Sequence, residues 1–259
     1  MDRNKGSRVA QSKEPLGVAV VGAGYWGPNL VRNFQASDRF RLRWLCDLDV
    51  DRAQKVLGAY STVQATADYA AVLADPEVAA VAVATPAGTH LDIALAALRA
   101  GKHVLVEKPL AATHADGLRL VTEAEERGLT LMCDHTYCYT PAVGRIRELV
   151  RSGELGEIHF VDSVRINLGL FKHDMNVLWD LAVHDLAIMD CLLPARPCAV
   201  SACGARHVPG GPENIAYLTL FFDGTLIAHI HANWLAPVKV RHTLIGGTGN
   251  DTYGVERTK

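Results

Sequence analysis

The sequence of 259 residues has few of the features that direct a chain to a membrane, the cell exterior or a nucleic acid. No apolar run is long enough to span a bilayer, and the opening stretch "MDRNKGSRVAQSKEP" contains no apolar signal-peptide core. The formal net charge of −2 gives no electrostatic reason to bind nucleic acid or an anionic membrane. We therefore expect a cytoplasmic protein.

The cysteines and histidines lack the spacings of metal sites. The six cysteines form no CxxC pair and no zinc-ligand pattern, and several lie within apolar runs. We expect buried free thiols in a reducing compartment. The eleven histidines form neither an HExxH motif nor a compact His/Cys cluster, so the sequence predicts no metal site.

The first half of the chain alternates apolar strand patterns with helical patterns. A continuous apolar run at residues 16–21 predicts a buried parallel strand, and similar runs end near residues 46, 85, 107 and 134. Amphipathic stretches lie between these runs. Repeated strand–helix units of this size predict an α/β fold, a doubly wound Rossmann-type parallel sheet with right-handed crossovers.

The pattern changes after residue 134. One more helical stretch covers "PAVGRIRELVRSGELG", and most of the remaining sequence is rich in alternating β patterns, with Asp223-Gly224 as a hairpin signal. Strands without intervening helices predict a mostly antiparallel, open-sheet domain of the α+β type. We expect a tail at 1–14, a nucleotide-binding domain at 15–134 and a substrate and oligomerisation domain at 135–259.

A glycine loop follows the first predicted strand. In "GAGYWG", Gly22 would allow a tight turn, Gly24 would let the backbone approach a pyrophosphate, and Gly27 would let the next helix pack on the sheet. Asp47 ends the next predicted strand, 20 residues beyond Gly27, where a carboxylate binds ribose hydroxyls and repels a 2′-phosphate. The sequence therefore predicts a dinucleotide site that prefers NAD to NADP. The alternative is a structural glycine turn with a solvated aspartate.

A lysine lies at the carboxyl end of another predicted strand. "HVLV" leads directly into "EKP", so Lys108 stands where ligands bind in open α/β sheets. Pro109 restricts the backbone of Lys108. From these residues alone, Lys108 is either a solvated loop charge or a functional group.

Four motifs together resemble the Gfo/Idh/MocA oxidoreductases, a family named for glucose–fructose oxidoreductase, inositol dehydrogenase and a rhizopine-catabolism protein. They are "GAGYWG" at 22–27, "ATPAGTH" at 84–90, "EKP" at 107–109 and "WDLAVHD" at 179–185. The resemblance extends over about residues 16–250 and implies a Rossmann domain followed by a mostly antiparallel sheet. It also implies hydride transfer between a nicotinamide cofactor and sugars, inositols or nucleotide sugars.

The resemblance assigns roles to the strand ends. It implies that Lys108 faces the nicotinamide and the reacting oxygen and that its peptide bond to Pro109 is cis, with Glu107 supporting the turn and the cofactor. Thr85 and Pro86 would pass beneath the nicotinamide. His90 either starts the next helix or contacts the cofactor. The residues expected to bind the cofactor are Gly22, Gly24, Tyr25, Trp26, Gly27, Asp47, Thr85, Pro86, His90, Glu107 and Lys108.

Asp180 and His184 are four residues apart in a predicted buried helix, so they share a face. A carboxylate beside an imidazole raises its basicity, which suits a general base. The resemblance implies that His184 takes the hydroxyl proton, assisted by Asp180, while Lys108 holds the same oxygen. The alternative is a structural i,i+4 pair. We leave the adjacent Asp185 out of the predicted site because it points elsewhere on the helix.

Other residues near the predicted domain junction are candidates for substrate contacts, although packing explains several of them equally well. They are His135, Tyr137, Arg165, Asn167, Lys172, His173 and Asn176. Relatives in the family continue beyond "IGGTG", whereas this sequence ends soon after it. We therefore expect an open hydrophobic sheet edge, which is either a liability for aggregation or a site for subunit pairing.

The resemblance favours an NAD-dependent dehydrogenase that acts on a secondary hydroxyl or keto group of a sugar, with a nucleotide sugar preferred. An inositol or free sugar is one alternative. A catalytically silent NAD-binding regulatory or assembly subunit is another. We also expect a homo-oligomer, a dimer or tetramer formed through the C-terminal sheet.

Overall fold

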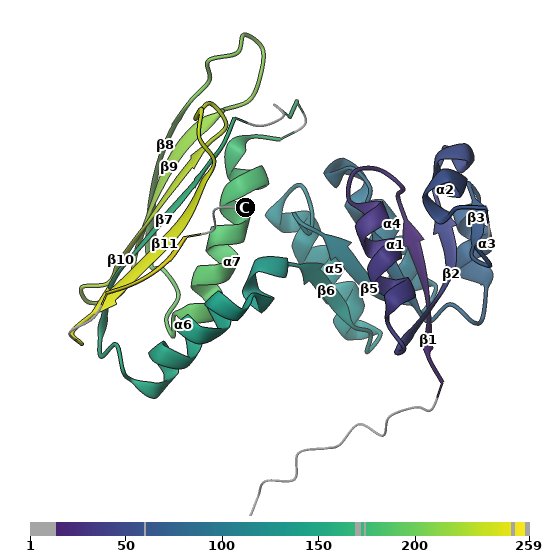
Figure 1. Cartoon of the computed structure of the whole chain (residues 1–259), viewed down its shortest axis with the longest axis horizontal. Helices are drawn as coiled ribbons and strands as arrows, with labels where there is room; N and C mark the ends of the chain where they lie inside the picture. Colours follow the sequence, from purple (N-terminus) through teal and green to yellow (C-terminus); the bar gives the residue numbers. More distant parts are fainter. Residues whose placement is uncertain (1–13, 60, 169–171, 174, 250–251, 257–259) are drawn as a thin grey trace, which may run out of the picture. The chain divides into compact units, whose positions relative to one another are not determined.

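The chain divides into two compact units, residues up to Asp134 and residues from His135 onward (Figure 1). The structure is a computed structural model that describes residues 14–59, 61–168, 172–173, 175–249 and 252–256. The first 13 residues of the expected tail lie outside the described residues, as do residues 169–171 and 174, which fall between the candidate substrate contacts Asn167 and Asn176.

The first unit contains a six-stranded, fully parallel sheet with the strand order β3-β2-β1-β4-β5-β6. This order confirms the predicted Rossmann-type architecture. The strand order reverses between β1 and β4, where open α/β sheets bind ligands at the strand carboxyl ends. The strands are β1 (Leu16–Val21), β2 (Phe40–Cys46), β3 (Gln64–Thr66), β4 (Ala80–Val83), β5 (His103–Glu107) and β6 (Leu131–Asp134).

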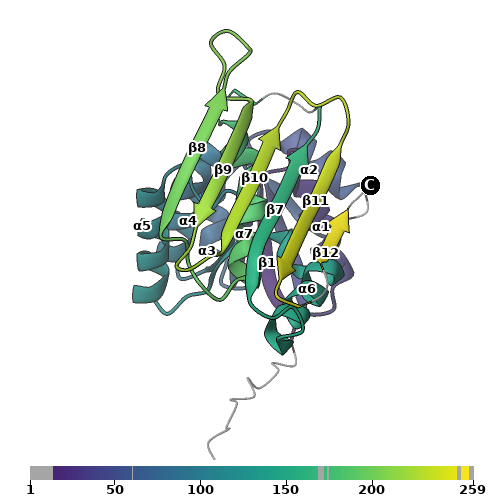
Figure 2. The ribbon, with the colours of Figure 1, turned by 90° about the vertical axis from the view of Figure 1, so that its left-hand side faces the viewer.

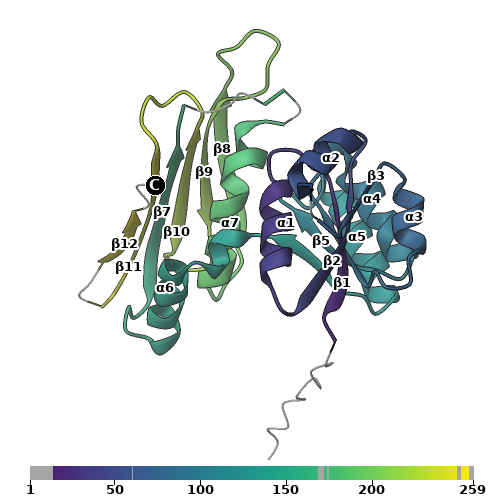
Figure 3. The ribbon, with the colours of Figure 1, turned by 45° about the vertical axis from the view of Figure 1, so that its right-hand side comes forward.

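Helices cover both faces of the first sheet (Figure 3). The helices α1 and α2 pack on one face through a cluster that includes Leu30, Val31 and Ala53, whereas α3, α4 and α5 pack on the other. Burial on both faces explains why the strands read as continuous apolar runs. The bounds are α1 (Gly27–Ala36), α2 (Val50–Leu57), α3 (Tyr69–Ala74), α4 (His90–Arg99) and α5 (His114–Glu126), with a 3₁₀ turn η1 (Ala87–Thr89) before α4.

The second unit contains a mixed six-stranded sheet with the order β12-β11-β7-β10-β9-β8 (Figure 2). Only β7 and β10 pair in parallel, so the predicted, mostly antiparallel sheet is confirmed. The edge strand β12 is an element that the sequence did not predict. The strands are β7 (Ile158–Ile166), β8 (Ala199–Ala205), β9 (Ile215–Phe221), β10 (Ile227–Asn233), β11 (Val240–Gly247) and β12 (Thr252–Glu256).

The helices of the second unit lie on one face of its sheet (Figure 1). They are α6 (Pro141–Ser152) and α7 (Val183–Leu192), with a 3₁₀ turn η2 (Thr136–Tyr139) before α6. Alternate residues Ala228, Ile230 and Ala232 of β10 face these helices and are fully buried. The buried helix predicted to carry Asp180 and His184 begins instead with a π-helical turn, η3 (Leu178–Ala182), a feature found often at functional sites.

The cysteines are only partly as predicted. All six are free thiols, and Cys46 is buried, but Cys198 and Cys203 are exposed. Cys203 lies on β8, an edge strand with every residue exposed, so its apolar neighbours in sequence do not cover it. Within the described residues, no helix has both the length and the apolar character needed to cross a bilayer.

Candidate active site

The glycine loop after β1 turns tightly and leaves space at one position. Gly22 has φ of 103°, a conformation that residues with a Cβ rarely adopt. A Cβ at Gly27 would clash with the carbonyl oxygen of Gly22. The first residue of α1 can therefore pack this closely against the loop only because it is glycine. A Cβ at Gly24, by contrast, would meet no atom within 4 Å. The loop thus leaves room for a ligand beside the backbone of Gly24.

The amino end of α1 adjoins this space. Trp26 is the N-cap residue and provides no side-chain cap, and Pro28 lies in the first turn. The first amides of a helix without such a cap can bind a phosphate, which the helix dipole also favours. Tyr25 is exposed and lies against Trp26 with ring centroids 6.2 Å apart. The loop therefore fits the pyrophosphate of a dinucleotide.

Asp47 connects the glycine loop to the end of β2. Its Oδ2 accepts a 2.6 Å hydrogen bond from the amide of Ala23, and its Oδ1 accepts bonds from the amide of Asp49 at 2.8 Å and from Arg52 at 2.6 Å. Burial alone would raise the pKa of Asp47, but these hydrogen bonds outweigh burial and hold the pKa below its usual value. Asp47 is therefore a fixed, ionised acceptor beside the loop. Sequence reasoning missed Arg52, although it lies only five residues beyond Asp47.

His90 connects the ends of β4 and β5. It is the first residue of α4, is 1% exposed, and places Nδ1 2.8 Å from the carbonyl oxygen of Pro109 and Nε2 2.9 Å from that of Thr85. The peptide bond between Lys108 and Pro109 is cis, as the family resemblance suggested. His90 thus holds the two loops on which Thr85 and Lys108 lie. Its contact with a cofactor stays a prediction.

Glu107 is the last residue of β5 and pairs in register with Asp134 on β6. Burial, reinforced by the negative charge of Asp134, raises the pKa of Glu107 to about 8. The raised pKa favours the neutral carboxyl, which suits a supporting residue better than a charged cofactor ligand. The adjacent Lys108 lies at the same edge of the first sheet as the glycine loop, because β1 and β5 are parallel strands of one sheet.

Asp180 lies in the π-helical turn η3 and is buried. Its Oδ1 forms a 2.9 Å ion pair with Lys172, and its Oδ2 accepts a 3.1 Å hydrogen bond from the indole of Trp234 on the segment after β10. The structure thus places Lys172, predicted as a substrate contact, against Asp180. The sequence did not indicate Trp234.

His184 lies on the first turn of α7 and contacts Tyr137 from η2. The two rings meet edge to face, with centroids 4.7 Å apart. Tyr137 also has the guanidinium of Arg165 over its ring, 4.5 Å from the centroid. Three residues predicted independently therefore lie together in the second unit: Tyr137, Arg165 and His184.

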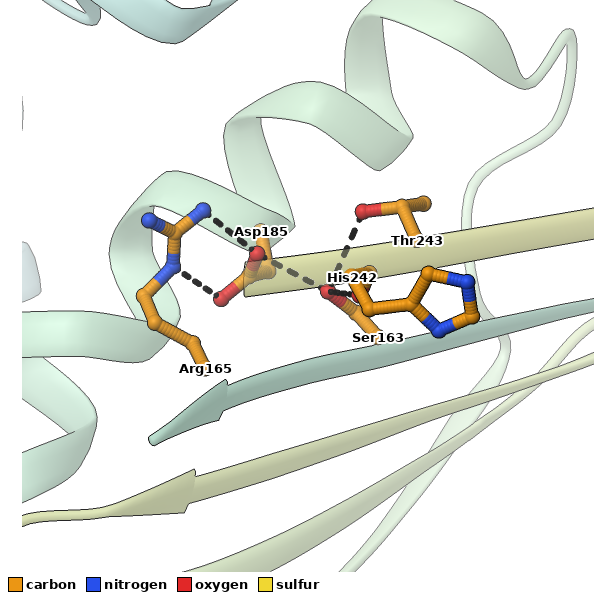
Figure 4. Close-up of polar contacts among 5 residues, drawn as sticks. All are labelled: Ser163, Arg165, Asp185, His242 and Thr243. Atoms are coloured by element: carbon orange, nitrogen blue, oxygen red, sulfur yellow. Dashed lines mark hydrogen bonds and ion pairs between the residues drawn. The ribbon is translucent and has the colours of Figure 1, made fainter. Parts of the chain in front are cut away.

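Asp185, which lies outside the predicted site, holds α7 against β7 (Figure 4). Its carboxylate accepts two 2.8 Å hydrogen bonds from Arg165 and one of 2.9 Å from Ser163. Burial would lower the pKa of Arg165, but Asp185 more than reverses this and raises it above the ordinary value. The sequence did contain a signal for this pair. Asp185 is a charged residue among apolar neighbours in a predicted buried helix, and a buried charge needs a partner.

The remaining candidates are more dispersed. The side-chain oxygen of Asn176 accepts a 3.2 Å hydrogen bond from the backbone amide of Trp179, within the turn that carries Asp180. The amide of Asn167 bonds to the carbonyl of Asn233, and His173 is exposed. His135 directly precedes η2. Substrate contacts of these residues stay predictions.

Comparison with known families covers nearly the whole described chain. Residues 16–135 match the family described as "Oxidoreductase family, NAD-binding Rossmann fold". Residues 143–250 match the "GFO/IDH/MocA C-terminal domain". The first unit is thus an NAD-binding Rossmann domain, as predicted.

Several known proteins are similar to this chain. UDP-N-acetylglucosamine 3-dehydrogenase of Acidithiobacillus ferrooxidans is 32% identical over 73% of the chain and 58% of its own length. A dTDP-3,4-didehydro-2,6-dideoxy-alpha-D-glucose 3-reductase of Streptomyces violaceoruber is 35% identical over 48% of the chain and 39% of its length. The solved structure of GenD2 from gentamicin A biosynthesis in complex with NAD is 29% identical, with a TM-score of 0.87 over 94% of this chain and 72% of that one. The chain spans less than two thirds of the length of the curated relatives that it matches.

Proposed function

Because the chain belongs to the Gfo/Idh/MocA oxidoreductase family, we propose that it is an NAD-dependent dehydrogenase acting on a secondary hydroxyl or keto group of a sugar, with a nucleotide sugar as the preferred substrate. The observation that carries the proposal is the position of Lys108 at the sheet edge that also carries the glycine loop and Asp47. Two similar proteins are named for reactions on UDP- and dTDP-linked sugars, which supports the substrate class.

Bound NAD would accept a hydride from the carbinol carbon of the substrate. The hydroxyl proton goes to a ring nitrogen of His184, and the carbon–oxygen bond becomes a carbonyl, so that protons and electrons balance. The ammonium of Lys108 stabilises the negative charge that develops on that oxygen. Asp180 lies in the turn before His184 and would assist the imidazole from there, with its carboxylate held by Lys172 and Trp234.

The test compares catalytic variants with matched controls. We expect Lys108→Ala and His184→Ala to lower kcat about 10²–10⁴-fold, because general acid–base groups and groups that stabilise a developing oxyanion contribute this much. NAD affinity should change little in His184→Ala. The controls are Lys55→Ala on α2 and His159→Ala on β7, both exposed. Reduced-nicotinamide absorbance is followed with UDP-, dTDP- and GDP-sugars, an inositol and free sugars. NAD binding without turnover on any of these would instead indicate a regulatory subunit.

We also propose self-association through the outer face of the second sheet. This face exposes Tyr217, Phe221 and Ile227, opposite the face that carries α6 and α7. Exposed apolar groups on neighbouring strands are typical of an interaction surface. Light scattering should give a dimer or tetramer for the wild type and a smaller species for Phe221→Lys. An unchanged mass for this variant would contradict the proposed interface.

A further inference from the structure

A cavity of about 360 Å³ lies within the second unit, between η2 and α6 on one side and β7 and β11 on the other. Its lining includes Tyr137, Thr140, Arg165, Arg241 and Thr243, together with apolar side chains of α6 and α7. At about 30 Å³ per water molecule, the cavity could hold about a dozen waters or one small organic molecule.

Arg165 presents an unused donor to this cavity. Its Nε and Nη2 bond to Asp185 (Figure 4). Within the described part of the chain its Nη1 has no hydrogen-bond partner, although the residue is only 4% exposed. Buried N–H groups are almost always paired, and an unpaired one on a charged guanidinium is costly. The donor therefore indicates a missing acceptor.

Arg241 supplies a second donor. It lies opposite Arg165 in the β7–β11 register, and its buried Nε also has no hydrogen-bond partner among the described residues. Its guanidinium lies 5.7 Å from the centroid of the Tyr137 ring, and that of Arg165 lies 4.5 Å from it. Cation–π contact with one ring holds both guanidiniums at the cavity.

The charges at the cavity favour a negative ligand. Asp185 neutralises Arg165, but no carboxylate within the described residues forms an ion pair with Arg241. Glu256 is the acidic residue of the lining, and its side chain is exposed on the edge strand, where it pairs in register with His242. One guanidinium charge therefore remains for a ligand. Guanidinium groups bind the oxygens of carboxylates and phosphates better than neutral hydroxyls.

We propose that this cavity binds an oxyanion of the substrate, a carboxylate or a phosphate, through Arg165 and Arg241. The proposal rests on the proposed function, because it takes His184 as the group that acts on the substrate hydroxyl. Tyr137 connects the two parts, since its ring contacts both guanidiniums and the ring of His184. The substrate is then an acidic or phosphate-linked sugar, and neutral inositols and free sugars are poor ligands.

Calorimetric titration of the NAD-loaded protein at low ionic strength tests this with three matched probes: glucose, glucuronate and glucose 1-phosphate. We expect at least one anionic probe to bind ten-fold or more tightly than glucose. A preference for glucuronate assigns the site to a carboxylate, and a preference for glucose 1-phosphate assigns it to a phosphate. Equal affinity for all three probes would overturn the proposal.

Variants then locate the site. Arg241→Gln should bring the anion and glucose affinities within about three-fold of each other, whereas Arg151→Gln, at an exposed position near the end of α6, should leave the preference intact. An unchanged preference in Arg241→Gln, with a melting temperature equal to that of the wild type, would exclude this cavity. Arg241→Lys keeps the positive charge but loses the planar guanidinium with its several N–H donors. Its preference for the anionic probe over glucose should lie between those of the wild type and Arg241→Gln.

The same titrations separate this inference from the proposed function. His184→Ala should lose turnover and keep the anion preference. If no sugar is oxidised but the Arg241-dependent preference persists, the redox proposal fails and the anion site stands. If glucose is oxidised as efficiently as its anionic analogues, the dehydrogenase proposal stands and the anion site is wrong.

Discussion

Replacing Asp185 with alanine should destabilise the second unit strongly. The carboxylate of Asp185 accepts three hydrogen bonds, two from Arg165 and one from Ser163, and both charged side chains are 5% exposed or less. The alanine variant leaves the guanidinium of Arg165 buried without a counterion. Removing one partner of such a buried pair costs about 3–5 kcal/mol, because the remaining charge keeps its desolvation penalty.

Calorimetry and hydrogen exchange can measure this loss. A change of about 3–5 kcal/mol in a domain of this size corresponds to a fall of about 10 °C or more in melting temperature. Hydrogen exchange should accelerate in α7 and β7, which the pair connects, while exchange in the first sheet stays unchanged. Asp162→Ala is the control, since Asp162 lies on β7 with Arg165 but is exposed, and its replacement should change the free energy of unfolding by less than about 0.5 kcal/mol.

A double variant separates the charge from the packing. Arg165→Met combined with Asp185→Leu removes both charges and keeps apolar volume, so most of the lost stability should return. The reasoning would be refuted if Asp185→Ala melted within about 2 °C of the wild type, or if the double variant were less stable than the single one. Either result would mean that the pair is not buried in solution as it is in the structure.

Three further predictions concern the first unit. The raised pKa of Glu107, caused by burial and by Asp134, means that its stabilising contribution is complete below about pH 4.5 and is lost as the pH rises through about 8. Between about pH 4.5 and 8, thermal unfolding should show the free energy of unfolding falling by about 2 kcal/mol, a value discounted for the partial exposure of Glu107. The Glu107→Gln variant should lack this fall, and a pH profile of the variant parallel to that of the wild type would contradict the reasoning. Arg52→Ala should weaken NADP binding at least ten-fold more than NAD binding in fluorescence titrations, because it removes the cation beside the ribose-binding carboxylate; equal losses would argue against this role. Gly27→Ala should fail to fold stably, whereas Gly24→Ala should fold normally and lose NAD affinity at least ten-fold, as melting curves and titration can show. A Gly24→Ala variant that binds NAD normally would place the pyrophosphate elsewhere.

The first unit was largely predictable because its signals are local. A continuous apolar strand, a glycine loop and the next helix follow one another along the chain, and a parallel sheet with right-handed crossovers brings the strand ends to one edge. Asp47 could be singled out from its position alone. Its partner Arg52 could not, because a basic residue on an exposed helical turn has the same pattern as any solvated side chain.

The second unit was less predictable because its contacts join distant segments. The carboxylate of Asp180 meets the indole of Trp234 across 54 residues, and Arg165 reaches Asp185 across 20. Periodicity predicted one continuous helix, and the π-helical turn at Asp180 has no sequence signal of its own. The strand β12 was missed because a pattern of five residues is too short to identify a strand by itself.

By itself the sequence determined the order of most strands and helices and the position of the glycine loop, since these depend on periodicity and on spacing along the chain. The roles proposed for Lys108 and His184 came from the family resemblance. Tertiary structure decided which polar groups are buried together. In the folded chain, His90 contacts two loop carbonyl oxygens, Asp185 forms hydrogen bonds with Arg165, and the ring of Tyr137 packs against that of His184. Such pairings depend on the low dielectric of a packed interior, and only the folded chain creates that interior.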